Sequence, residues 1–310
     1  METYILEAVF LFYKTNYYNQ NFDYDFEETN NNITLNIREN VFQAIIRILV
    51  ANNLINYSKN KIYINQNQKE YLNQLVNSIK RDEKLLSQCE SLFIQSNQNR
   101  EYFFAELNEI EYEIYSRENF NYSYHIGLKL VPFIDFSEAK ILDVGGNSGG
   151  LATAIAINFK SAQITVVDTA IPCYVGNEFR VTNAISNISF VESDFFDFEL
   201  DRNYDYVLLS NILHDFSDEQ CITILKQCKK HGEKILIIED VLKNDFSPIE
   251  ILSHGLRMAI NVKDGRQRTQ KQIKKLLSLV EYKTNKIHHL SEVHSFVYGE
   301  NQLKRSKSLC

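Results

Sequence analysis

The stretch Lys140–Gly150, which reads KILDVGGNSGG, constrains the fold of this 310-residue chain more than any other. An apolar strand pattern ends at Asp143–Val144, a glycine-rich turn follows, and a small-residue helix pattern begins near Leu151. Glycine lets the backbone pass close to a ligand, so this order of strand, tight turn and helix is typical of nucleotide-binding sites. We therefore expect an α/β fold with a ligand site at this turn.

Further apolar runs alternate with helical patterns after this turn. The runs are ITVVD, ISFVE, YDYVLL, KILIIED and a late SFVYG. Alternation of this kind predicts a doubly wound, Rossmann-like parallel sheet with helices on both faces. We expect this catalytic domain to span residues 122–300, followed by a flexible tail over 301–310.

The glycine turn alone does not identify its ligand. Its residues do not fit G-x-G-x-x-G, and either a structural turn or an NAD site is compatible with them. A P-loop is excluded because no Gly-Lys-Ser/Thr follows. Asp168 closes the next strand pattern 25 positions after Asp143, near the spacing of about 20 at which an acid reaches ribose hydroxyls.

Residues 1–100 predict a separate, mostly helical domain. Apolar residues from Val41 to Leu54 recur at helical spacing, and a polar break at Ser58–Lys61 between two short apolar runs predicts a hairpin. Helix followed by hairpin is the outline of a winged helix, which either binds DNA or serves as a dimer interface. This region holds 10 Lys and Arg against 11 Asp and Glu, and its candidate recognition helix carries only Arg38 and Arg47 as cations. Since DNA readers carry a basic stripe, we expect a dimerisation domain and no nucleic-acid partner.

The connection between the two domains reads as helical. Residues 98–118 predict a long amphipathic helix, and we assign 101–121 as the linker. Its aromatic residues Tyr102, Phe103 and Phe104 are expected in core or dimer packing, with a place in the substrate pocket as the alternative.

Composition and charge exclude several classes of function. The net charge of −7 argues against a broad nucleic-acid or membrane surface. There is no apolar run long enough to span a bilayer, and the N-terminus lacks the basic lead-in of a signal peptide. The five cysteines form no CxxC pair, so we expect no disulfide framework, no metal and a reducing cytoplasm. His288, His289 and His294 lack companion ligands at metal spacing and are expected at the surface.

Four more segments occur in a fixed order. They are VESDFFD at 191–197, DYVLLSNILHDFSDEQCITILKQCKK at 205–230, KILIIEDVL at 234–242 and GRQRT at 265–269. Together with ILDVGGNSGG, they resemble the class I S-adenosylmethionine (SAM)-dependent small-molecule O-methyltransferases, which include plant caffeate-type and bacterial polyketide-tailoring enzymes. The resemblance covers residues 120–300 strongly and residues 1–100 loosely.

The resemblance implies SAM as the cofactor and assigns residues to it. The residues that would hold the methionine part of SAM are Asp143, Gly145, Gly146, Asn147 and Gly149. Asp168 would bind the ribose hydroxyls, and Asp194 and Phe195 would bracket the adenine. Ser210 would lie near the cofactor at the mouth of the fourth strand. From the residues alone, Asp194 is equally explained as the cap of a turn.

The resemblance also implies the catalytic residues. His214 would be the general base, and Glu239 would accept a hydrogen bond from its far ring nitrogen and fix its tautomer. Asn211, His254 and Met258 fall where the family lines its acceptor pocket. Without the resemblance, His214 reads as a helix-capping histidine and Glu239 as an ordinary strand-end carboxylate.

Four positions depart from the family pattern. Asn147 replaces the middle glycine of the turn, but Asn tolerates a left-handed backbone better than most residues. Ser210 replaces a common lysine, as in the bacterial branch, and Asn211 replaces the aromatic residue beside it. Gln267 stands where the family carries a glutamate beside the histidine, so either Glu239 orients His214 alone or base catalysis is weakened.

We therefore expect a homodimeric SAM-dependent O-methyltransferase that acts on a small aromatic or polyketide-like hydroxyl. The first alternative is an enzyme of the same fold that performs N- or C-methylation or non-methyl chemistry. The second alternative, from a different class, is a winged-helix regulator that senses SAM.

Overall fold

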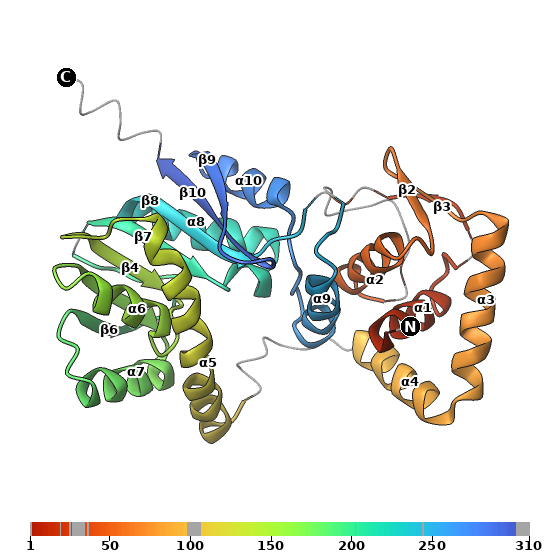
Figure 1. Cartoon of the computed structure of the whole chain (residues 1–310), viewed down its shortest axis with the longest axis horizontal. Coiled ribbons are helices and arrows are strands. Elements are labelled where there is room, and N and C mark those ends of the chain that lie inside the picture. Colours follow the sequence, from red (N-terminus) through yellow and green to blue (C-terminus); the bar gives the residue numbers. More distant parts are fainter. Residues whose placement is uncertain are drawn as a thin grey trace. The chain divides into compact units, whose positions relative to one another are not determined.

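The computed structural model describes residues 2–18, 20–24, 26, 35, 37–97, 107–201, 203–243 and 245–301. The chain divides into two compact units (Figure 1). The first unit combines residues 1–103 with residues 242–269, and the second combines residues 104–241 with residues 270–310. The aromatic residues Tyr102, Phe103 and Phe104 and most of the tail lie outside the described residues. Within the described part of the chain, none of the helices has the length and hydrophobicity to cross a bilayer.

The first unit is mostly helical. Its elements are α1 (Thr3–Tyr13), β1 (Phe22–Asp23), α2 (Glu39–Ala51), β2 (Asn56–Ser58), β3 (Lys61–Tyr63), α3 (Gln66–Arg81), α4 (Glu83–Asn97) and α9 (Glu250–Asn261). The expected helix and hairpin are present as α2 and the antiparallel pair β2–β3. The strand β1 adds to β3 and completes a small three-stranded sheet.

Helix α9 and the segment after it are bound within the first unit by Arg38, which precedes α2, and by Arg47 of α2. The Arg38 guanidinium donates to the carbonyl oxygens of Ile260 and Val262 at the end of α9, at 2.6 and 3.1 Å. The Arg47 side chain donates to the backbone carbonyl of Gln267. Both cations of the candidate recognition helix therefore bind backbone carbonyls of their own unit. Residues 242–269 were expected in the catalytic domain, and these contacts explain why they group with the N-terminal region.

The second unit is built on a seven-stranded sheet. Its elements are α5 (Glu109–Leu130), η2 (Val131–Phe133), β4 (Lys140–Val144), α6 (Gly150–Asn158), β5 (Gln163–Asp168), α7 (Ala170–Thr182), β6 (Ile188–Glu192), β7 (Tyr204–Ser210), η3 (Leu213–Asp215), α8 (Asp218–His231), β8 (Gly232–Asp240), α10 (Gln270–Leu279), β9 (Tyr282–His289) and β10 (His294–Asn301).

The strand order is β6-β5-β4-β7-β8-β10-β9. The chain moves from β4 outward to β6, returns to the other side of β4 with β7, and continues to β8. Because parallel crossovers are right-handed, this reversal places α6 and α7 on one face and α8 on the other. Helix α5 packs against α6 and α7, and α10 packs against α8, so both faces of the sheet are covered (Figure 1). The core between α5, α6 and the sheet is formed by apolar residues such as Ile126, Leu151 and Ile155.

The structure corrects two details of the sequence analysis in this unit. The sheet is mixed, because β10 runs antiparallel to both β8 and β9, and β9 was not expected. The helix α5 begins at Glu109 and continues to Leu130, rather than ending near residue 121. Asn108 starts it with a capping box, in which its side chain accepts from the Glu111 amide and Glu111 bonds back.

Candidate active site

Polar side chains line the carboxyl edge of the sheet in the second unit. Parallel strands bring their carboxyl ends to the same edge, and open α/β sheets bind ligands there. The antiparallel strand β10 begins at this edge, because its first residue, His294, lies opposite Asp240 at the end of β8. The residues in question, in the order of the strands, are Asp168, Asp143, Ser210, Glu239, Asp240 and His294.

The glycine turn after β4 has the backbone that the sequence predicted. Gly145, Asn147 and Gly149 all have a positive φ, of +67°, +52° and +76°. A Cβ on Gly146 would lie 2.5 Å from the Asp143 carboxylate, so only glycine leaves room for that carboxylate. The replacement of glycine by Asn147 is therefore accommodated in a left-handed conformation, and its amide donates to Asp168 at 2.8 Å.

Asp143 is a fully buried carboxylate without a hydrogen-bond partner at either oxygen. Burial, together with the nearby charge of Asp168, raises the pKa of Asp143 to about 7. Leaving a buried carboxylate without a partner is costly, and a cationic ligand would relieve that cost. Asp143 therefore marks a place for positive charge.

Asp168 differs from Asp143 because the backbone satisfies it. It accepts from the amides of Asn147 and Thr169, at 2.8 and 2.7 Å. Burial raises the pKa of Asp168 to about 6 although these hydrogen bonds act to lower it. The loop between β4 and α6 is thus held against the end of β5 through one carboxylate.

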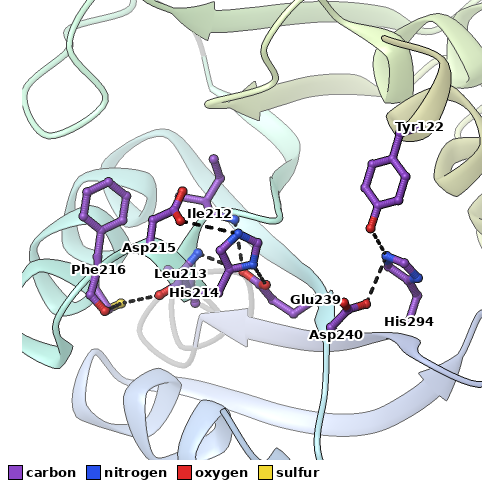
Figure 2. Close-up of polar contacts among 10 residues, drawn as sticks. Tyr122, Ile212, Leu213, His214, Asp215, Phe216, Glu239, Asp240 and His294 are labelled. Carbon is purple, nitrogen blue, oxygen red and sulfur yellow. Dashed lines mark hydrogen bonds and ion pairs between the residues drawn. The ribbon is translucent and has the colours of Figure 1, made fainter. Parts of the chain in front are cut away.

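His214 lies on the short helix η3 between β7 and α8. Its local sequence explains this position. Ser217 begins α8 with a capping box, so the short turn before Ser217 lies outside that helix and carries the histidine. The ring nitrogen Nδ1 lies 2.7 Å from Oε2 of Glu239, at the end of the next strand (Figure 2). A carboxylate oxygen can only accept, so Nδ1 carries the hydrogen and the ring orientation is fixed.

Glu239 holds the whole loop as well as the histidine. Its other oxygen accepts from the amides of Ile212 and Leu213, at 3.0 and 2.8 Å. The side chain is nearly buried. An ordinary strand-end carboxylate would face water, whereas this one joins the end of β8 to the loop that carries His214.

A second carboxylate faces the other nitrogen of His214. Nε2 lies 3.6 Å from Oδ1 of Asp215. Burial alone would lower the pKa of His214, but the charges of Glu239 and Asp215 outweigh it and raise that pKa to about 9. The ring is therefore an imidazolium at neutral pH, and it becomes a base only after it loses the Nε2 proton. Asp215 was not predicted as a site residue, although it follows His214 directly.

The remaining predicted residues of this unit are distributed along the same edge. The Ser210 hydroxyl is buried without a hydrogen-bond partner, and Asn211 has a left-handed backbone with φ of +55°. Asp194 is exposed and caps its own turn by accepting from the Phe196 amide at 2.9 Å. Phe195 is buried and packs edge-on against Phe216.

The other predicted residues belong to the first unit. His254 is exposed and Met258 is half-buried, one turn apart on α9. Gln267 is buried, and neither its amide oxygen nor its amide nitrogen has a hydrogen-bond partner. It lines a small cavity of the first unit together with Gln43 and Arg47.

A second acid–histidine pair stands beside the first and was not predicted. His294 is buried, contrary to the expectation of a surface residue, and its Nε2 lies 3.1 Å from Oδ1 of Asp240. The Tyr122 hydroxyl of α5 lies 2.8 Å from the same nitrogen (Figure 2). The only sequence signal was the doublet Glu239–Asp240, whose second acid we left unassigned.

The residues at the glycine turn fit the cofactor that the resemblance implies. SAM carries a cationic sulfonium and an ammonium group, and Asp143 offers two buried oxygens without a partner beside a turn that keeps room for a ligand. Among the described residues, no group of three or more His, Cys, Asp or Glu side chains is arranged to hold a metal ion.

A family model for the O-methyltransferase domain matches residues 103–283, which is more than half of the chain. The chain belongs to this O-methyltransferase family. The match includes the glycine turn, His214, Glu239 and Gln267, and it ends inside β9.

Plant enzymes are among the sequence relatives of this chain. The chain is 38% identical over 152 residues to 3-O-methylredipecamine 2-O-methyltransferase IpeOMT3 of Carapichea ipecacuanha, covering 44% of this chain and 40% of that enzyme. It is 34% identical to (RS)-norcoclaurine 6-O-methyltransferase of Thalictrum flavum subsp. glaucum, covering 51% of this chain and 44% of that enzyme. The chain thus spans about two fifths of the length of the curated relatives it matches.

Solved structures show the same fold. An O-methyltransferase family 2 protein from Planctomyces limnophilus, in complex with apigenin, has a TM-score of 0.73 at 15% identity and covers 86% of this chain and 82% of its own. The human N-acetylserotonin methyltransferase, in complex with SAM, has a TM-score of 0.59 at 17% identity, covering 96% and 93%. At these identities the similarity establishes the α/β methyltransferase fold with a helical N-terminal domain.

Proposed function

We propose that this protein is a SAM-dependent O-methyltransferase that transfers a methyl group to a hydroxyl of a small molecule. The observation that carries the proposal is the pairing of His214 Nδ1 with Glu239 at 2.7 Å, on the same sheet edge as the buried Asp143. One side of this edge is built to hold positive charge, and the other presents an oriented histidine. The curated relatives named above are O-methyltransferases, which supports the same reaction.

His214 acts as the general base in this proposal. With Nδ1 held by Glu239, the nitrogen that meets the acceptor is Nε2. After the imidazolium has lost its Nε2 proton, this nitrogen would take the proton of the acceptor hydroxyl and leave its oxygen as the nucleophile. Such proton transfer contributes about 10²–10⁴-fold to a rate. Glu239 stabilises the imidazolium that forms.

The cofactor would be held by residues of the β4 and β5 ends. When bound, SAM would supply an activated methyl group for transfer to an oxygen nucleophile, with S-adenosylhomocysteine as the leaving group. Asp143 would compensate the positive charge of SAM, and Asp168 would accept hydrogen bonds from its ribose hydroxyls. Ser210 would lie beside the cofactor at the end of β7. The turn from Gly145 to Gly149 and the pair Asp194–Phe195 complete the proposed cofactor site.

Further parts of the proposal rest on the family resemblance. They are a small aromatic or polyketide-like acceptor lined by Asn211, His254 and Met258, a homodimer formed through a dimerisation domain at residues 1–100, a catalytic domain at residues 122–300, and a role in secondary metabolism in the cytoplasm. The described cysteines are buried free thiols, which supports a reducing compartment.

One observation favours a second candidate function. Gln267 replaces the family glutamate, and its buried amide has no hydrogen-bond partner. An enzyme that does not need the family glutamate at this position could use the same cofactor for N- or C-methylation or for non-methyl chemistry.

The test is turnover with SAM and a panel of hydroxylated acceptors: apigenin, 8-hydroxyquercetin, norcoclaurine and N-acetylserotonin. S-Adenosylhomocysteine and the methylated product are measured together by mass spectrometry. A methyl ether that forms in step with S-adenosylhomocysteine supports the proposal. Binding of SAM without any methyl ether supports the second candidate, and no binding of SAM contradicts both.

A further inference from the structure

One face of helix α2 carries the polar residues Asn40, Gln43 and Arg47, spaced three and four positions apart. The outer two bind the backbone of the segment after α9 directly. The Asn40 side chain donates to the carbonyl oxygen of Gly265 at 2.8 Å, and the Arg47 side chain donates to the carbonyl oxygen of Gln267. Between them, the side-chain oxygen of Gln43 is buried and has no hydrogen-bond partner among the described residues. The row of polar contacts along α2 is therefore interrupted at Gln43.

The orientation of the Gln43 amide makes its oxygen an acceptor that lacks a donor. Its Nε2 donates to the carbonyl oxygen of Phe26 at 3.4 Å, so Oε1 is the atom left over. Only 2% of Gln43 is exposed, so this oxygen does not reach bulk solvent. Because an unsatisfied buried acceptor costs free energy, we expect a donor beside it.

The amide of Gln267 is a second group of the same kind. Only 3% of this residue is exposed, and within the described part of the chain neither Oε1 nor Nε2 has a hydrogen-bond partner. A Cβ on Gly255 of α9 would lie 3.2 Å from Cγ of Gln267, so glycine at this position keeps room for the side chain. Gln43, Gly255 and Gln267 line the same small cavity of the first unit.

The size and the chemistry of this cavity limit its occupant. It has room for about one water molecule. The guanidinium groups of Arg47 and Arg266 also line it, which disfavours a cation such as ammonium. A halide ion could not donate to Gln43 Oε1. A water molecule both donates and accepts, and buried waters typically make about three hydrogen bonds to polar groups of this kind.

We propose that the first unit binds a single water molecule in this cavity, which joins Gln43 of α2 to the side chain of Gln267. The water donates to Gln43 Oε1 and hydrogen-bonds the Gln267 amide. Together with Asn40 and Arg47, it completes the row of polar contacts that holds the segment after α9 on α2. The glutamine that replaces the family glutamate thus serves to fix residues 265–269, and this inference does not depend on the proposed reaction.

The first test is the sign of a stability change. Gln267→Met keeps the length of the side chain and removes both polar atoms. If a water molecule binds the amide, the substitution loses those hydrogen bonds, and the unfolding temperature should fall by about 2–4 °C. If the amide is unsatisfied, the substitution removes a costly buried polar group, and the unfolding temperature should rise. The exposed Gln74→Met, on α3, is the matched control and should leave the unfolding temperature unchanged.

Two further measurements address the shared water directly. Gln43→Met and Gln267→Met combined should lower the unfolding temperature by less than the sum of the single effects, because either substitution alone already disrupts the same water site. In crystals grown with bromide in place of chloride, a density peak should lie within hydrogen-bond distance of Gln43 Oε1 and of the Gln267 amide, without an anomalous bromide signal. A bromide signal in the cavity, an empty cavity, or a higher unfolding temperature in Gln267→Met would overturn the inference.

Discussion

Asp143 and Glu239 are buried carboxylates of the same sheet with opposite surroundings. Asp143, on β4, has no hydrogen-bond partner at either oxygen. Glu239, on β8, accepts from the amides of Ile212 and Leu213 and from the ring of His214. A satisfied carboxylate orders its own loop, whereas one without a partner is stabilised only by what binds to it. We therefore propose that the Asp143 side of the edge binds the ligand and that the Glu239 side is prebuilt for catalysis.

Removing the histidine should lower the rate and leave the affinity for SAM nearly unchanged. His214→Ala is expected to lower kcat by about 10²–10⁴-fold, because the base is lost. Affinity for SAM, measured by calorimetry, should change less than about twofold. The exposed His125→Ala is the control and should keep full kcat. An unchanged kcat in His214→Ala would mean that positioning alone drives the reaction.

Neutralising Asp143 should weaken the binding of SAM. Asp143→Asn is expected to weaken SAM binding by about 100-fold, since the partner of a cation is removed. The exposed Asp201→Asn should bind SAM normally.

The same substitution should stabilise the protein when no ligand is present. The folded pKa of Asp143, about 7, lies above its ordinary 3.8, so the folded state holds the proton more tightly and stability falls as pH rises between these values. At pH 8, Asp143→Asn should therefore raise the free energy of unfolding by on the order of 2 kcal/mol. Equal stability of the two proteins in urea unfolding at pH 8 would contradict the account.

Removing the charge of Glu239 should shift the titration of His214. In Glu239→Gln, the His214 pKa should fall from about 9 toward its ordinary 6.5, measured by NMR of the ring nitrogens. Because the folded pKa is raised, the stabilisation is complete below about 6.5 and is lost as pH rises through about 9. The variant should thus be less stable than the wild type at pH 6 and similar at pH 10.

The rate should follow the same titration. In the wild type, kcat/KM for the acceptor should rise with pH up to about 9 and should reach its plateau at lower pH in Glu239→Gln. The plateau itself should fall about tenfold, because the imidazolium loses its stabilising charge. Glu192→Gln, at the end of β6, is the control. An unshifted profile would show that Glu239 does not set the basicity of His214.

The smallest effect is expected at Gln267. Both ring nitrogens of His214 already face carboxylates of its own unit, Glu239 and Asp215. Gln267→Glu should therefore change kcat/KM by less than about threefold. An increase of tenfold or more would mean that the catalytic side is incomplete without the family glutamate.

The fold was predictable where burial leaves a simple pattern. Strands buried on both faces appear as continuous apolar runs, which is why β4, β5 and β8 could be placed from the sequence. The edge strand β9, which reads YKTNKIHH, shows no such run. The direction of β10 was also hidden, because an apolar run reads the same for parallel and antiparallel neighbours.

The candidate site was predictable where a motif is contiguous. The glycine turn and the His214 segment are local, and the structure places both at the carboxyl edge of the sheet. The contact between His294 and Asp240 depends on the register of two strands, and a lone histidine carries no signal of it. In the same way, residues 242–269 join the first unit through donors on α2 and directly before it, which no local pattern reveals.

The most direct test of the account is the proton balance of SAM binding, measured by calorimetry at pH 6.5 in buffers of different ionisation enthalpy. Because the pKa of Asp143 is about 7 before a cation binds, the carboxyl is largely protonated at this pH and must ionise when SAM binds. The account predicts that SAM binds once per chain and releases protons, and that Asp143→Asn both weakens binding and abolishes most of this release. Tight binding without proton release, or unchanged release in Asp143→Asn, would contradict the claim that Asp143 is the partner of the cofactor's positive charge.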